Sequence, residues 1–395
     1  MPALACARTA LAALLLTLVP LVGGCAESPA PPPKLPQAPV NFSMKEAIVT
    51  SQDVATEEEL RRRGEKALLE QRWQDAVDAF KTLVAADPNG PHASEYLFNL
   101  ALAEEGLQDR TAARDSFLSL ATRFPTAPNA RVALVRAASL DAFLEDWKAL
   151  AAIGDTILGR SDIDEIDRLV GLGARGLANV ELGNDHPASK DINDGLDLAD
   201  RHHYGATDVL PVAVAQLRFA LGELRRTRSE QITFDPFPPD FVDRLEERSQ
   251  LLLQAQEAYA MAARSADPHW ASMSGFHVGA MYRNLHRDLM QIAPPKEAKT
   301  EKQKQLFYAF MHVRYRILLQ KGLAQIEQTL ALADRMQDSS PWIARAKEAK
   351  DEMETALADE KAQLARMPFK EEEMEAAIAG LIAEQRKKAN GGPAK

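Results

Sequence analysis

Cysteine is almost absent from this chain. Its 395 residues include only two cysteines, Cys6 and Cys25, both close to the N-terminus. The chain after residue 25 therefore cannot form a disulfide or a thiolate metal site, whatever the redox state of its compartment. Aromatic residues are also scarce, at 6%. Beyond about residue 57, apolar residues recur at helical spacing and give almost no strand signal, which predicts an all-α protein.

An excess of positive charge is missing as well. The formal net charge is −10, and no stripe of lysine and arginine runs along any predicted helix. Without such a stripe there is no counterion release to stabilise a complex with nucleic acid. The same acidity argues against electrostatic binding to anionic lipid. We therefore expect no nucleic-acid partner.

Motifs of catalysis and of cofactor binding are not found. None of the eight histidines lies in an H-E-x-x-H pattern, and no P-loop or supported G-x-S-x-G elbow occurs. Acidic runs such as residues 371–373 have no apolar surroundings to raise their pKa values, so we interpret them as solvated helix faces. We expect no catalytic residue, no cofactor and no metal, with a histidine metal site as a minor alternative.

One sequence, from Gly171 to Gly176, matches the dinucleotide fingerprint G-x-G-x-x-G, and Asp191 or Asp194 follows at a plausible distance. A true fingerprint opens a helix directly after a strand. Here the preceding residues, 162–170, are acidic and helical in pattern. We therefore predict that these glycines allow helices to pack closely.

The N-terminus carries a short apolar segment that ends in small residues. Arg8 precedes an almost wholly apolar stretch from Thr9 to Val22, and Leu21-Val22-Gly23-Gly24-Cys25 follows. The stretch is shorter than the roughly 20 residues that span a bilayer. It resembles a bacterial lipobox, which implies that residues 1–24 are a signal peptide and that Cys25 carries lipid, palmitate included. The alternative is an ordinary secretory signal in which Cys25 is incidental.

Two further features fit this resemblance. Ala26 follows the cysteine, as in lipoproteins sorted to the outer membrane, so we expect lipid anchoring there, on the periplasmic face. Residues 25–45 are rich in proline, which fixes φ and removes hydrogen-bond donors, and they predict a semi-rigid linker. A proline-rich ligand for another domain is the weaker alternative.

A repeated pattern covers residues 57–200. Ala76 and Phe80 precede Pro88, and Ala113 and Phe117 precede Pro125 at the same spacing. Leu150 continues the register. This pattern resembles the tetratricopeptide repeat, a helix-turn-helix unit of about 34 residues. The resemblance implies a right-handed superhelix of antiparallel helix hairpins, with small residues where the two helices cross: Gly64, Ala101, Ala138 and Gly176 in the first helices, and Ala76, Ala113 and Ala188 in the second.

The second half, residues 206–388, follows the pattern only loosely. Gly279-Ala280-Met281-Tyr282 suggests one more unit, whereas the segment from Phe234 to Pro239 interrupts what should be one hairpin. We predict long helices at about 241–265, 269–291, 300–336 and 341–365 and a last one at 371–388. Residues 389–395 are expected to be a disordered tail.

In a superhelix of such repeats, the first helix of each hairpin lines a concave groove that binds peptides. The resemblance implies groove positions on three predicted first helices: Arg61 and Glu65; Phe98, Leu102 and Glu105; and Val135 and Ser139. The alternative is that Phe98 and Leu102 merely pack against the following repeat.

Taken together, these features predict a scaffold lipoprotein that binds other envelope proteins. The segment from Leu120 to Ala130 resembles the repeat junction of envelope repeat proteins such as the lipoprotein of the outer-membrane β-barrel assembly machinery. The combination also resembles myxobacterial repeat lipoproteins, which implies gliding motility or assembly of a pilus secretin as the process served. A cell-wall enzyme or a solute-binding lipoprotein with an unrecognised site remains the alternative.

Overall fold

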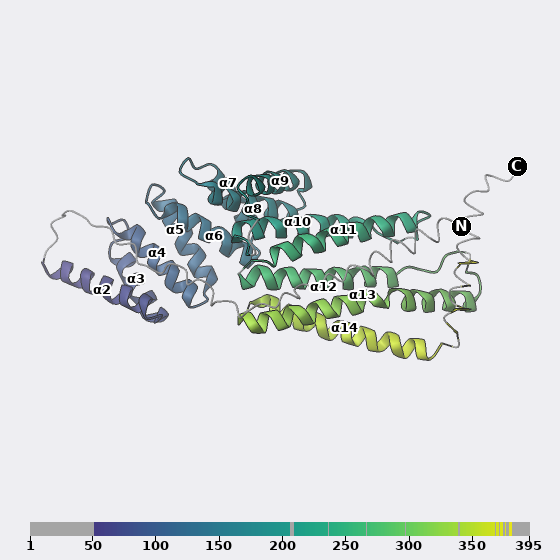
Figure 1. Ribbon diagram of the computed structural model, residues 1–395. Helices are drawn as coiled ribbons and strands as arrows, with labels where there is room; N and C mark the ends of the chain where they lie inside the picture. The colour runs from purple at the N-terminus through teal and green to yellow at the C-terminus, as the bar shows by residue number, and fades with distance from the viewer. Residues whose placement is uncertain are drawn as a thin grey trace. The chain divides into compact units, whose positions relative to one another are not determined.

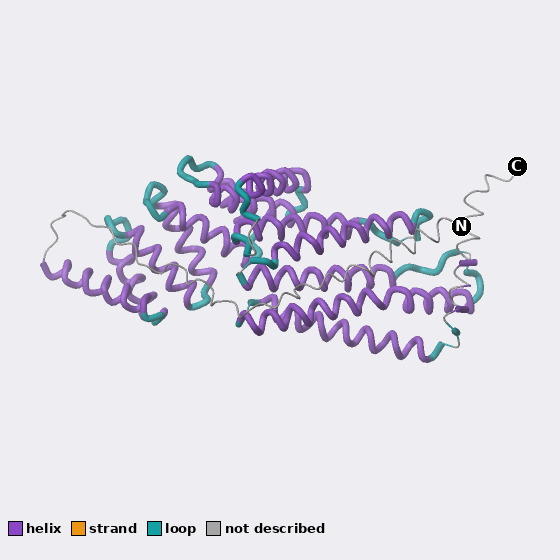
Figure 2. Tube along the Cα trace, in the orientation of Figure 1, coloured by secondary structure: helices purple, strands orange, loops and turns teal. Residues whose placement is uncertain are grey.

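The computed structural model describes residues 51–205, 209–235, 237–265, 267–296, 298–338, 340–367 and 369–370, with scattered positions from 372 to 380. The expected signal peptide, lipobox, Cys25, linker and tail lie outside this part, as does most of the last expected helix. The described residues form thirteen α-helices and no strand (Figure 2). One isolated bridge joins Leu210 to Ser265. The expected all-α class is confirmed for these residues.

The first eight helices belong to one compact unit, within which consecutive helices pack against each other (Figure 1). They are α2 (Ser51–Leu69), α3 (Trp73–Ala86), α4 (Ala93–Gly106), α5 (Arg110–Arg123), α6 (Ala130–Leu144), α7 (Trp147–Leu158), α8 (Glu165–Glu181) and α9 (Asp185–Arg201).

The remaining five helices belong to a second compact unit. They are α10 (Val212–Gln231), α11 (Phe241–Ala262), α12 (Pro268–Met290), α13 (Glu301–Met336) and α14 (Pro341–Ala365). The bounds of the last four agree with the expected ones to within a few residues. One expectation was wrong: the segment around Phe234 does not interrupt a hairpin. It connects α10 to α11, which pack against each other along their lengths.

The helix crossings in the first unit occur at the expected small residues. A Cβ atom on Gly64 of α2 would lie 2.9 Å from Cζ of Phe80 in α3, and one on Gly176 of α8 would lie 2.9 Å from Cγ1 of Ile192 in α9. Contacts this short leave no room for a side chain, so glycine sets the helix separation. The equivalent Ala101 and Ala138 are fully buried. On the second helices, so are Ala76, Ala113 and Ala188.

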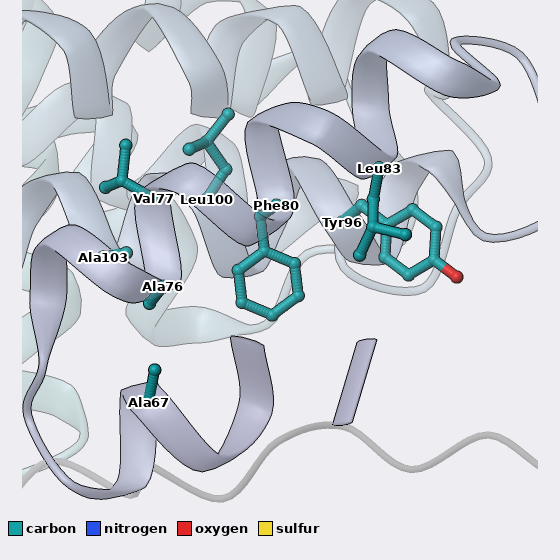
Figure 3. Packing of buried hydrophobic residues seen from close by; sticks show 8 residues of the cluster. All are labelled: Ala67, Ala76, Val77, Phe80, Leu83, Tyr96, Leu100 and Ala103. Atoms are coloured by element: carbon teal, nitrogen blue, oxygen red, sulfur yellow. The ribbon is translucent and has the colours of Figure 1, made fainter. Parts of the chain in front are cut away.

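Phe80 lies at the centre of the core between the first helices (Figure 3). It packs with apolar side chains from α2, α3 and α4, namely Ala67, Ala76, Val77, Leu83, Tyr96, Leu100 and Ala103. Because a second helix contacts the first helices on both sides of it, each repeat shares its core with the next. This sharing is the usual source of stability in repeat proteins.

Proline and aspartate set the helix ends. α3 ends two residues before Pro88 and α5 two residues before Pro125, since proline cannot continue the hydrogen-bond ladder. Asp109 and Asp146 cap α5 and α7 by accepting hydrogen bonds from the backbone N–H groups of Ala112 and Ala149, at 3.1 and 3.2 Å. These two caps stand at equivalent positions of successive repeats.

The turn within each hairpin of this unit contains one left-handed residue at a fixed position. The φ angles are 57° at Gln71, 65° at Gln108, 59° at Glu145 and 77° at Gly183. After each, the backbone N–H reaches back over the helix end to a carbonyl, as from Asp109 to Glu104 at 3.0 Å, in a Schellman-type closure. Only Gly183 avoids the steric cost that a Cβ atom incurs in this conformation.

Replacing Glu145 by glycine should therefore stabilise the protein. Glycine relieves the strain of the left-handed conformation, but it also raises the entropy of the unfolded chain. The net effect should be an increase of about 1 kcal/mol in the free energy of unfolding. Urea unfolding followed by circular dichroism measures it, with Glu145→Ala as the control that removes the side chain but keeps the Cβ atom. A loss of stability in the glycine variant would contradict the role assigned to this turn.

Candidate first-helix binding face

The seven residues predicted to line a groove lie on three successive first helices of the first unit. Arg61 and Glu65 belong to α2, and Phe98, Leu102 and Glu105 belong to α4. Val135 and Ser139 belong to α6. Six of the seven are partly buried and Ser139 is exposed. We call these residues, together with Glu58, Glu95 and Val132 at equivalent helical positions, the first-helix face.

Polar contacts hold the first helices side by side. The hydroxyl of Tyr96 in α4 donates to Oε1 of Glu57 in α2 at 2.7 Å. Nη1 of Arg136 in α6 donates to Oε2 of Glu105 in α4 at 2.5 Å. Arg131 of α6 contacts Asp167 in α8 and, at 3.1 Å, Asp164 just before it. Side chains on successive first helices therefore form one continuous face.

The middle of the face is apolar. The ring of Phe98 packs edge-on against Phe117 of α5, with centroids 5.5 Å apart. α4 and α5 form one hairpin, so this contact holds Phe98 within its own repeat. Part of Phe98 and part of Leu102 remain exposed, as do Val135 and Val132, the latter with 37% of its surface accessible.

The α2 end of the face is charged. Arg61 forms ion pairs with Glu58 at 2.7 Å and Glu65 at 2.6 Å, and the hydrogen bond to Glu58 is the main reason that the pKa of Arg61 is raised. On α4, partial burial raises the pKa of Glu95, which faces Nδ1 of His92 at 3.6 Å. Partly exposed pairs of this kind contribute at most about 1 kcal/mol each to stability, so their main effect is on the electrostatic field of the face.

A second set of hydrogen bonds joins successive repeats at the loops that follow the second helices. Sequence reasoning missed these bonds. Arg123, the last residue of α5, donates to the carbonyl of Pro88 in the preceding repeat. Arg160 donates to the carbonyl of Pro125 one repeat later, at 3.2 Å. In the sequence pattern, the two prolines serve only as markers of the repeat spacing. Pro88 and Pro125 are separated by the same number of residues as Arg123 and Arg160, and this equal spacing is the sequence signal that could have predicted the two contacts.

Two buried acids, also missed, occupy equivalent positions near the ends of α4 and α6. Glu104 accepts a hydrogen bond from the hydroxyl of Ser116 at 2.6 Å. Asp141 accepts one from Arg114 at 3.3 Å. Burial raises the pKa of both, and that of Asp141 reaches about 6. Each acid joins a first helix to the second helix of a hairpin, so their roles are structural.

The glycines of the dinucleotide-like sequence lie inside α8, with no strand before them. A Cβ atom on Gly171 would lie 2.8 Å from Cγ of Leu158, the last residue of α7. No turn presents backbone N–H groups to a pyrophosphate. The prediction that these glycines serve helix packing is confirmed for Gly171 and, by its contact with Ile192, for Gly176.

In the second unit, two buried carboxylates each join three helices. Glu223 of α10 contacts Nδ1 of His277 in α12 at 3.0 Å and accepts a hydrogen bond from Tyr259 in α11. Glu360 of α14 lies 2.7 Å from Nε2 of His286 and 3.1 Å from Nδ1 of His312. Although burial opposes its charge, contacts with both histidines lower the pKa of Glu360 to about 2.

No group of three or more histidine, cysteine, aspartate or glutamate side chains suited to a metal ion occurs among the described residues. None of the helices in that part of the chain has the length and apolarity needed to cross a membrane.

Comparison with known proteins gives distant structural likenesses only. No family model matches the chain, and no curated protein matches it. A solved structure of a tetratricopeptide repeat protein from Parabacteroides merdae ATCC 43184 is similar, with 14% sequence identity and a TM-score of 0.40. The match covers 76% of this chain and 99% of that one. At this distance, the description of the fold as tetratricopeptide-like rests on the helix hairpins and crossings above.

The buried acid Asp141 predicts a pH dependence of stability. Its pKa of about 6 in the folded chain lies above the value of about 3.9 for an unfolded aspartate, so the folded state binds more protons between these values. Its contribution to the free energy of unfolding therefore falls as pH rises from about 4 to about 6. Urea unfolding across this pH range should show a smaller fall in the free energy of unfolding for Asp141→Asn than for the natural chain. Asp78→Asn, at an exposed position of α3, is the control. An unchanged slope in Asp141→Asn would refute the assignment.

Proposed function

We propose that this protein is a lipid-anchored scaffold that binds other envelope proteins on its first-helix face. The observation that supports the binding function best is the continuity of that face. Three first helices are held side by side and present partly exposed apolar side chains between charged ones. Helix-hairpin repeats commonly use such extended surfaces to bind proteins.

The anchoring part of the proposal rests on the sequence. The lipobox-like segment from Leu21 to Cys25 supplies a lipid attachment site, and the proline-rich linker would hold the repeats away from the membrane. Two or three acyl chains on one cysteine bind a membrane stably, where one chain does not. A partner bound to an anchored scaffold is concentrated at the membrane surface. The outer membrane, with Cys25 on its periplasmic face, is the proposed location.

For the cellular process, we propose a class of envelope complex. Assembly or operation of an envelope complex, such as the gliding machinery, a pilus secretin or the outer-membrane assembly machinery, would use a scaffold of this kind. Glu104 and Asp141 of the first unit, and the acid–histidine pairs at Glu223 and Glu360 of the second, join neighbouring helices. None of these groups favours the alternative of a cell-wall enzyme.

The proposal predicts two separable losses in a Gram-negative host that lipidates the protein. Cys25→Ser should move the protein from the membrane fraction to the soluble periplasm, because its anchor is gone. Phe98→Ala combined with Leu102→Ala should leave it in the membrane but should abolish the capture of envelope proteins after mild crosslinking. Circular dichroism and thermal unfolding serve as folding controls for the double variant.

Two outcomes would contradict this account. Retention of Cys25→Ser in the membrane would refute lipid anchoring. Capture of the same proteins by the folded double variant would refute binding on the first-helix face.

A further inference from the structure

The cations of the first-helix face are already bound to carboxylates on that face. Arg61 forms ion pairs with Glu58 and Glu65, and Arg136, at the edge of the face, pairs with Glu105. Glu95 adds a fourth carboxylate and no further guanidinium. An incoming anion would therefore have to displace a glutamate from an arginine. An incoming cation would add to a field that is negative overall.

The carboxylates flank apolar side chains at helical spacing. Glu95 lies one turn before Phe98 on α4, and Glu105 lies about one turn after Leu102. Val132 and Val135 continue the apolar part onto α6. A matching ligand thus needs apolar side chains in the middle and positive charges at both sides.

From this arrangement we propose that the first-helix face binds a peptide segment of a partner protein in which lysine or arginine flanks leucine-like side chains. This inference rests on the proposed function and names the chemistry of its partner. Apolar contact with Phe98, Leu102 and the two valines supplies most of the binding free energy. The glutamates supply selectivity and a faster association rate, because opposite charges steer the encounter.

An acidic segment fits less well. It would meet Glu58, Glu65, Glu95 and Glu105 while both arginines are engaged. Like charges placed together across an interface cost binding free energy, so the face selects against such a segment as well as for a basic one.

The test measures the binding of two synthetic peptides to the purified full-length protein in detergent. Both form amphipathic helices of the same length with leucine on one side. One carries lysine on the flanks of the leucine stripe and the other carries glutamate. Fluorescence anisotropy should show binding of the lysine peptide, weakened by added salt, and no saturable binding of the glutamate peptide.

Two charge variants separate the face from the net charge of the chain. Glu95→Gln with Glu105→Gln should weaken binding of the lysine peptide by about tenfold. This is the loss of affinity expected when two surface ion pairs, each near the top of the usual energy range, are removed. Asp78→Asn with Asp115→Asn removes two charges from the second helices α3 and α5, and it should leave the affinity unchanged.

Equal binding of the two peptides, or wild-type affinity in the glutamine variant with its fold intact, would overturn the proposed partner chemistry. Neither result would contradict the proposed function. That function is tested separately, by the loss of captured envelope proteins in the Phe98 and Leu102 double variant. Conversely, if that variant kept its captured proteins, both the proposed function and this inference would fall together.

Discussion

The close approach of two helices within each hairpin is the constraint on which the rest of the first unit depends. Gly64 and Gly176 leave no space for a Cβ atom, and Ala101 and Ala138 are fully buried at the equivalent crossings. With the backbones this close, Phe80 and Phe117 are enclosed between helices, and the first helices are brought near enough for Tyr96 and Arg136 to bridge them. The proposed binding face is thus a consequence of small residues that lie beneath it.

Polar groups in this unit join helices both within a repeat and between successive repeats. Arg123 and Arg160 bind proline carbonyls of the preceding repeat, while Glu104 and Asp141 join first to second helices from buried positions. Burying a carboxylate is costly unless it is paired, and burial raises the pKa of Asp141 even though Arg114 donates a hydrogen bond to it. The second unit uses the same device with longer helices, where Glu223 and Glu360 each join three of them.

Much of this fold could be predicted from the sequence, because repeated small and aromatic residues report helix crossings directly. Ala76, Ala113 and the two prolines gave the register, and the helix bounds in the second half followed from Pro341 and from apolar periodicity. The left-handed turns at Gln71, Gln108 and Glu145 could not be predicted in this way, since neither glutamine nor glutamate marks a positive φ as glycine does. Of the site, the partly exposed positions on α2, α4 and α6 were predicted, whereas the contacts between first helices depend on a superhelix geometry that spacing alone does not specify. The functional role of these positions and the anchor at Cys25 remain predictions.

The central claim is that the crossing residues determine the packing of the first unit and hence its binding face. Native-state hydrogen exchange on Ala101→Leu tests it most directly, with Ala85→Leu at an exposed position of α3 as the matched control. Overpacking a close crossing costs about 1–3 kcal/mol, so amides throughout α2 to α9 should lose protection, while those of α10 to α14 keep theirs because they belong to a separate compact unit. Unchanged protection in α2 to α9 of the Ala101→Leu variant would contradict the claim.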